Sequence, residues 1–164
     1  MSFLLMNHPR GEDTDVARLA AAVAAVRSIT DPAAQSRLAD QLRQELAGPY
    51  HYLCATADGR IIGYMKWRFG EDPGFNFVDM EELGIVVKAK AAEIGKALIM
   101  KAEEGSLADF RQRSPYAYFL KLPLGDPELL SLAQQLRYQF SQDDQDSGKR
   151  SGFYKLFRPI NNQP

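Results

Sequence analysis

The sequence predicts one α/β domain, a mixed β-sheet with helices on both of its faces. Two observations support this. In four segments, apolar residues recur at spacings of three and four, which is the period of an amphipathic helix. Between and around these segments lie apolar runs of strand length, two of which flank an Asp-Gly pair typical of a hairpin. The length of 164 residues fits a single domain spanning 1–164.

Composition narrows the class of function. The 20 basic and 21 acidic residues give a net charge of −1, which disfavours a nucleic-acid partner. One cysteine and two histidines leave no internal disulfide and argue against a metal site. No apolar run approaches the roughly 18 residues of a membrane span, and no secretory segment is evident. We therefore expect a cytoplasmic protein with no membrane partner, acting on a small molecule or on an exposed side chain.

The first third predicts a strand over 3–6 and then two helices. The first helix follows the capping side chains of residues 13–15 and carries the apolar stripe Val16, Leu19, Val23 and Val26. The second begins at Asp31-Pro32, with aspartate as the cap and proline in the first turn. Its stripe is Leu38, Leu42 and Leu46, and Gly48-Pro49 should end it.

The middle third changes to strands. The runs 50–57 and 60–69 flank Asp58-Gly59, whose residues accept the positive φ angles of a tight hairpin turn. Residues 70–76 read as a loop, and 77–87 as a third long strand antiparallel to the second. Simple alternation along this third strand would place Asp79, Glu81, Leu83 and Ile85 on one face, with Met80, Glu82 and Gly84 on the other.

The last third predicts a helix from about 93 to 113 and a strand over 116–122. A helix then starts at Asp126-Pro127, with the stripe Leu129, Leu132 and Leu136. Two final strands, 137–141 and 153–157, are separated by a polar stretch, 142–151, that we expect to be a mobile loop. Residues 160–164 form a tail.

The junction after the third long strand suggests a ligand-binding site. A helix begins there after a short turn of small residues, and its first N–H groups have no partner within the helix. Together with the helix dipole and with Lys88, Lys90 and Lys96, these groups predict a site for a phosphate or pyrophosphate. The alternative is an ordinary strand-to-helix connection with solvated lysines.

The order of elements and several short motifs resemble the GNAT superfamily of N-acetyltransferases over nearly the whole chain. Leu83-Gly84-Ile85 is similar to the apolar pattern of the family's fourth strand, and residues 90–95 to its pyrophosphate loop. Residues 95–99 and Leu136-Arg137-Tyr138 are similar to later family motifs. The resemblance implies a mostly antiparallel sheet of about seven strands, acetyl-CoA as the cofactor, and transfer of its acetyl group to an amine.

By this resemblance the pyrophosphate binds the N–H groups of residues 91–96, and the pantetheine arm pairs with the end of the fourth strand. The cofactor-binding residues so implied are Leu83, Ile85, Val86, Val87, Lys90, Ala91, Ala92, Glu93, Ile94, Gly95 and Lys96. Two positions depart from the family pattern. Lys90 replaces Arg or Gln, and Glu93 replaces a glycine, so that a carboxylate stands beside the expected pyrophosphate.

Glu81 is the first candidate for the base that takes the proton of the amine, and Asp79 is the second. With Glu82, these acids would also attract a cationic amine. The alternative is a solvated acidic strand end. Tyr138 is the candidate acid for the leaving thiolate, or else a core aromatic residue. Cys54 is expected to be a buried structural thiol.

Three functions remain open at this stage. The first is acetyl transfer to a small-molecule or protein amine that the sequence does not identify. The second is a non-catalytic protein of the same fold that binds CoA or a protein partner as a regulator. The third is an unrelated α/β module that binds another anion. The resemblance also allows a homodimer through the final hairpin.

Overall fold

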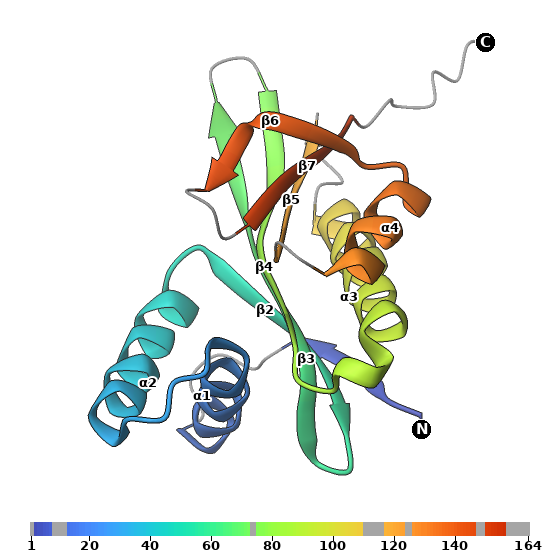
Figure 1. Ribbon diagram of the computed structural model, residues 1–164. Coiled ribbons are helices and arrows are strands. Elements are labelled where there is room, and N and C mark those ends of the chain that lie inside the picture. Colours follow the sequence, from blue (N-terminus) through green and yellow to red (C-terminus); the bar gives the residue numbers. More distant parts are fainter. Residues whose placement is uncertain are drawn as a thin grey trace, which may run out of the picture.

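The computed structural model describes residues 2–7, 13–72, 75–109, 117–123, 126–146 and 150–156 (Figure 1). In this part of the chain a seven-stranded sheet has the order β1-β2-β3-β4-β5-β7-β6. The strands are β1 (Leu4–Asn7), β2 (Tyr50–Ala57), β3 (Arg60–Asp72), β4 (Phe75–Ile85), β5 (Ala117–Pro123), β6 (Gln139–Asp146) and β7 (Arg150–Leu156). The pair β4–β5 is parallel and the other pairs are antiparallel. The predicted fold class is confirmed.

Helices cover both faces of the sheet (Figure 1). One face carries α1 (Asp13–Arg27) and α2 (Pro32–Ala47), and the other carries α3 (Ala91–Asp109) and α4 (Pro127–Gln135). None of the helices in the described part of the chain is long and apolar enough to cross a membrane. Each pair of helices buries its own apolar cluster against the sheet, which gives two core clusters among the described residues.

The predicted helical stripes form these cores. Val16, Leu19 and Val23 of α1 pack with all three leucines of the α2 stripe in one cluster. Leu129 and Leu132 of α4 belong to the other cluster. Burial of a leucine-sized side chain contributes about 1.5–3 kcal/mol, so these stripes account for the attachment of the helices.

Local capping explains where two of the helices begin. The Asp31 carboxylate accepts a hydrogen bond from the Ala34 N–H at 2.7 Å, and the Asp126 carboxylate accepts one from the Leu129 N–H at 3.2 Å. Both caps were predicted. In α1 the prediction was wrong, because Asp13 is already helical and residues 13–15 therefore lie inside the helix.

The hairpin of β2 and β3 turns at Asp58 and Gly59, whose φ angles are 50° and 72°, as predicted. The next hairpin is tighter than expected. Gly70 pairs with Phe77, and the pairing continues to Asp72 and Phe75, so most of the expected loop 70–76 is strand. Glycine suits this pairing, because a Cβ on Gly70 would lie 2.0 Å from the Phe77 ring, which crosses the strand at that point.

The final hairpin also differs from expectation. The strand β6 runs to Asp146 and β7 begins at Arg150, so most of the stretch 142–151 is strand and not a loop. A polar sequence can form such a strand at a sheet edge, where pairing depends on the backbone and one side meets solvent. Residues 147–149 and 160–164 lie outside the described residues, as does the part of the expected third helix beyond Asp109.

Cys54 lies in β2 with 2% of its surface exposed. Burial, with a smaller contribution from the charge of Asp15, raises the pKa of its thiol to about 12. A thiol with so high a pKa is almost entirely protonated near neutral pH and is a poor nucleophile. Its position agrees with a structural residue.

Gly95 of α3 packs against α4 and β4. A Cβ at this position would lie 3.0 Å from Leu129, 3.2 Å from Leu132 and 3.4 Å from Leu83. By contrast, a Cβ on Gly105 of the same helix would meet nothing within 4 Å.

We predict opposite effects of alanine at these two glycines. Gly95→Ala should lower the free energy of unfolding by about 1 kcal/mol, because overpacking outweighs the gain in helix propensity. Gly105→Ala should raise it by about 0.5–1 kcal/mol. Urea denaturation followed by circular dichroism measures both. Equal effects of the two variants would contradict a packing role for Gly95.

Candidate functional site

An extra residue interrupts the pairing of β4 with β3. Glu82 pairs with Lys66 and Met80 pairs with Trp67, so Glu81 is a β-bulge. A bulge reverses the alternation of side chains beyond it. Met80 therefore shares the apolar core with Leu83, whereas Asp79 and Glu81 contact side chains on the same face as Glu82. The simple alternation expected from the sequence is wrong for this reason.

The strands β4 and β5 separate just past this point. Their parallel pairing joins Phe77–Met80 to 117–120, and no pairing of β4 with the described part of β5 continues beyond Met80. The strand β5 goes on to pair with β7 as far as Pro123, while β4 pairs with β3 as far as Ile85. The last residues of β4, which run on towards α3 (Figure 1), thus leave β5.

The backbone direction at the end of β4 follows from the hydrogen bonds to β3. The Val86 N–H donates to the Ile62 carbonyl at 2.9 Å. Bonded and non-bonded pairs alternate in an antiparallel ladder, so Leu83 and Ile85 point their N–H and C=O groups away from β3. We call these groups the open edge of β4. Val87 lies outside it, because its N–H donates to Ile62 at 3.3 Å and its carbonyl accepts from Lys90 at 3.1 Å.

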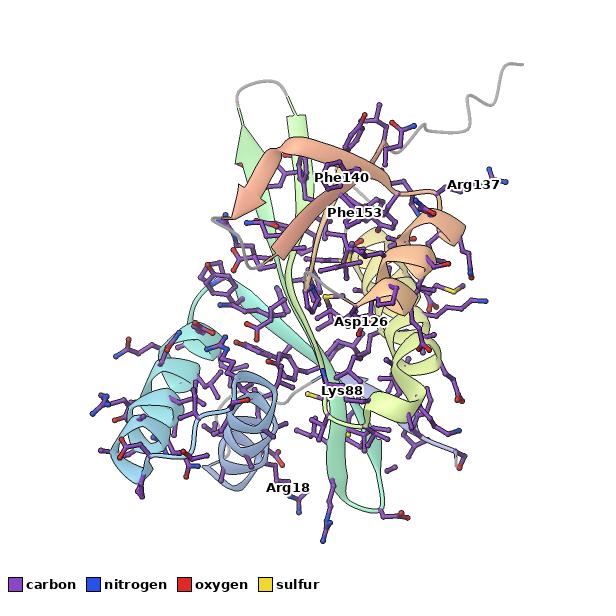
Figure 2. All side chains as sticks on the ribbon, viewed as in Figure 1. Arg18, Lys88, Asp126, Arg137, Phe140 and Phe153 are labelled. Carbon is purple, nitrogen blue, oxygen red and sulfur yellow. The ribbon has the colours of Figure 1, made fainter. Side chains whose placement is uncertain are left out.

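A 3₁₀ turn over Lys88–Lys90 leads from β4 into α3, which begins at Ala91. Figure 2 shows Lys88 where β4 gives way to α3. The Ala91 N–H donates to the Lys88 carbonyl. The N–H groups that follow belong to the first turn of α3, where a helix offers them no carbonyl acceptor of its own. Lys88 and Lys96 are exposed. The Lys90 ammonium lies 3.0 Å from the Glu93 carboxylate.

The predicted cofactor residues of α3 fall into two groups. Ala91, Ile94 and Gly95 face the apolar core, so only their backbone could contact a ligand. Ala92, Glu93 and Lys96 are exposed to solvent. The helix therefore presents backbone N–H groups and a few polar side chains at its first turn, which is the arrangement expected of an anion site.

On the opposite face of the sheet, Glu82 joins α1 to the strands. The Arg27 guanidinium contacts both Glu82 oxygens, with Nε 3.1 Å from Oε1, and the Tyr64 hydroxyl donates to Glu82 at 2.5 Å. Burial alone would lower the pKa of Arg27, but the hydrogen bond and charge of Glu82 outweigh it and raise that pKa. Glu82 is 6% exposed and is held as a structural anion.

A second ion pair joins α2 to the sheet. The Glu45 carboxylate accepts a hydrogen bond from Tyr52 at 2.6 Å and lies 3.0 Å from the Lys66 ammonium. Burial would raise the pKa of Glu45, but hydrogen bonds from Tyr52, Gln41 and Lys66 lower it instead. Burial and the contact with Glu45 raise the pKa of Tyr52.

Glu81 and Asp79 lie beside these ion pairs. The Glu81 carboxylate contacts Arg68 Nε at 3.0 Å, Lys66 at 3.6 Å and the Tyr50 hydroxyl at 3.3 Å. Asp79 lies 3.5 Å from the Arg68 guanidinium. The three acids of β4 therefore have cations of the chain beside them, which weakens the attraction for an amine expected from the sequence. Among the described residues, no three metal-binding side chains converge.

The sequence did not predict which side chains pair with these acids, although one pattern pointed to some of them. Tyr64, Lys66 and Arg68 alternate along β3, so a polar face of that strand could be foreseen. Arg27 and Glu45 come from helices whose predicted stripes emphasised only apolar residues. Their polar roles depend on the packing of those helices.

Tyr138 lies elsewhere. Its hydroxyl donates to Glu103 of α3 at 2.5 Å, and Lys155 of β7 lies 2.8 Å from the same carboxylate. Burial and the negative charge of Glu103 raise the pKa of Tyr138, which makes it a weaker acid. The side chain is 3% exposed. This environment favours the core aromatic role of Tyr138 over the role of proton donor.

Comparison with known proteins bears on the fold. No protein-family model and no curated sequence matches the chain. Many solved structures do. The PaiA N-acetyltransferase of Thermoplasma acidophilum, solved with coenzyme A, is 14% identical with a TM-score of 0.68, and the match covers 96% of this chain and 100% of that one.

Two further structures agree. An aminoglycoside 6′-acetyltransferase type Ii has 12% identity and a TM-score of 0.70, covering 95% of this chain and 98% of its own. A GNAT-family acetyltransferase of Streptococcus pneumoniae has 15% identity and a TM-score of 0.63, covering 94% and 100%. The identities are low, but the coverage is nearly complete in both directions. The chain has the fold of the GNAT-family acetyltransferases.

Proposed function

We propose that this protein transfers the acetyl group of acetyl-CoA to a primary amine. One observation carries the proposal. The strands β4 and β5 part beyond Met80, and the open edge of β4 leads within a few residues to the first turn of α3. A long ligand with an amide chain at one end and a pyrophosphate at the other matches this order of groups.

The open edge of β4 suits the pantetheine arm. Leu83 and Ile85 offer backbone donors and acceptors that an extended amide chain can pair with, as an added strand would. The first turn of α3 suits the pyrophosphate, because its N–H groups and the exposed Lys88 and Lys96 are all positive in character. The likeness in fold to a protein solved with coenzyme A supports this assignment.

The thioester of acetyl-CoA would supply an activated acetyl group. The chain's own residues would stabilise the oxyanion formed when the amine attacks, with backbone N–H groups of Leu83 or Ile85 as donors. We propose Glu81 as the group that takes the ammonium proton, directly or through a water, and Asp79 as the second candidate. Glu81 is the more accessible, since its side chain is 20% exposed against 12% for Asp79.

The pair Lys90–Glu93 supports a second candidate function. A carboxylate in the first turn of α3 repels a pyrophosphate, and its contact with Lys90 at 3.0 Å occupies the cation that would otherwise attract one. A protein that binds CoA weakly and responds to it, without catalysis, would have the same fold and the same pair.

The first experiment tests CoA binding by thermal shift. CoA and acetyl-CoA should each raise the melting temperature of the wild type, whereas Ala92→Glu should lose most of that rise. An added carboxylate at the first turn repels the pyrophosphate but favours the free helix, so the unliganded variant should stay folded. Met100→Glu, at a position of the same helix that is 50% exposed, is the matched control. A wild type that neither ligand stabilises would contradict the proposed function.

The second experiment removes the carboxylate that stands where the family pattern has glycine. Glu93→Gln keeps a good helix-forming residue and frees Lys90. We expect CoA to bind about fivefold more tightly, as expected for a change of about 1 kcal/mol. Isothermal titration at low and high salt measures the change, and the gain should shrink at high salt. Weaker binding by Glu93→Gln would show that Glu93 supports the site.

The third experiment separates an enzyme from a CoA-binding regulator. Release of free CoA thiol from acetyl-CoA is followed with sisomicin and with a peptide that begins with alanine. We chose these amines because solved structures of similar fold include an aminoglycoside acetyltransferase with sisomicin and a ribosomal-protein-alanine N-acetyltransferase. Turnover above the rate of hydrolysis supports the enzyme. Binding of CoA without turnover supports the regulator.

A further inference from the structure

We propose that Arg68 of β3 is a positioning residue, which holds the Glu81 carboxylate at the bulge of β4 so that it can take the proton of the acceptor amine. This inference rests on the proposed function. It assigns a role to a residue that neither the sequence analysis nor the resemblance singled out.

The geometry of the guanidinium supports this role. Arg68 Nε lies 3.0 Å from Glu81 Oε1, and Nη2 of the same group lies 3.5 Å from Asp79 Oδ2. Arg68 pairs directly across from Asp79, whereas Glu81 is the bulged residue without a position in that ladder. A planar guanidinium has several donors at fixed angles, so one side chain can hold two carboxylates. Arg68 therefore spans the two candidate bases.

The bulge explains why Glu81 needs a positioning residue. A bulged residue leaves the regular ladder, and its side chain loses the direction that cross-strand neighbours would impose. Glu81 must then be directed by its own side-chain contacts. Arg68 and the Tyr50 hydroxyl, at 3.3 Å, both donate to Oε1, which fixes the carboxylate from two strands at once.

Tyr50 also organises the cations. Its ring lies under the Lys66 ammonium at 4.2 Å and near the Arg68 guanidinium at 6.0 Å, within the range of cation–π attraction. Lys66 lies 3.6 Å from Glu81 Oε2 and is shared with Glu45. The charged and titratable groups recorded near Glu81 in the described part of the chain include Tyr50, Lys66, Arg68, Asp79 and, behind Lys66, Glu45. The Arg27–Glu82 pair is next along β4.

Exposure distinguishes Arg68 from a residue that mainly stabilises the fold. Its side chain is 36% exposed, whereas that of Lys66 is 10% exposed. An ion pair open to water to this extent contributes little to stability, about 0–1 kcal/mol. Loss of Arg68 should therefore leave the fold intact and affect the site.

The experiment measures kcat and KM for acetyl-CoA from thiol release, with sisomicin and the alanine peptide as amines. For Arg68→Gln we expect kcat to fall about tenfold to hundredfold. The KM for acetyl-CoA and the CoA thermal shift should stay unchanged. Arg68→Lys should restore only part of kcat, because an ammonium lacks the planar donors with which a guanidinium can hold two carboxylates. Arg60→Gln, an exposed arginine of the same strand, is the control.

A double variant tests the link to Glu81. The kcat of the double variant Glu81→Gln with Arg68→Gln should be no lower than that of Glu81→Gln alone, because Arg68 then has no carboxylate at position 81 to position. Additive losses would overturn the proposal. So would an Arg68→Gln variant that keeps the kcat of the wild type, and in that case acetyl transfer itself would stand. A wild type that binds CoA without turnover of either amine overturns both the enzyme and the role of Arg68.

Discussion

The bulge at Glu81 is the constraint on which the rest of the site depends. One extra residue in β4 reverses the direction of the side chains before it, which brings Asp79, Glu81 and Glu82 to one face and leaves Met80 with Leu83 in the core. The pairing with β5 also ends at Met80, directly before the bulge. The same short segment thus separates the strands and gathers the acids. In a regular strand, alternation would have put Asp79 and Glu81 on the face of Leu83 and Ile85, in the apolar core.

Two buried ion pairs are the second feature on which the site depends. Arg27–Glu82 and Glu45–Lys66 tie the two helices on one face to the strands beneath them. Taking ions out of water costs several kcal/mol each, and the attraction within such pairs only offsets that cost when hydrogen bonds complete them. Here Tyr64 and Tyr52 complete them. Apolar residues could have attached the helices equally well, so what such pairs add is a fixed geometry. Glu81 has more solvent access than Glu82 and lies beside these pairs.

The two ends of the site differ in whether their charged side chains are balanced by partners of opposite charge. At the acid-rich end, cations of the chain stand beside the carboxylates, so little net field reaches the solvent. At the first turn of α3, Lys88 and Lys96 remain exposed, and Lys90 is paired with Glu93. An anion would thus meet a net positive field at the helix, while an amine would meet a nearly balanced one. For the proposed transfer to an amine, recognition of the acceptor would then depend on shape and hydrogen bonds more than on charge.

The sequence by itself determined the order of the elements, the caps at Asp31 and Asp126, the turn at Asp58-Gly59 and the position of the strand-to-helix junction. These depend on neighbours within a few residues, where spacing and side-chain chemistry decide the outcome. Only the tertiary structure decided the bulge, the packing role of Gly95 and two distant contacts. These are Arg27 with Glu82, 55 residues apart, and Glu103 with Tyr138, 35 residues apart. Such contacts depend on the register of strands and on the packing of helices, and no local pattern encodes either.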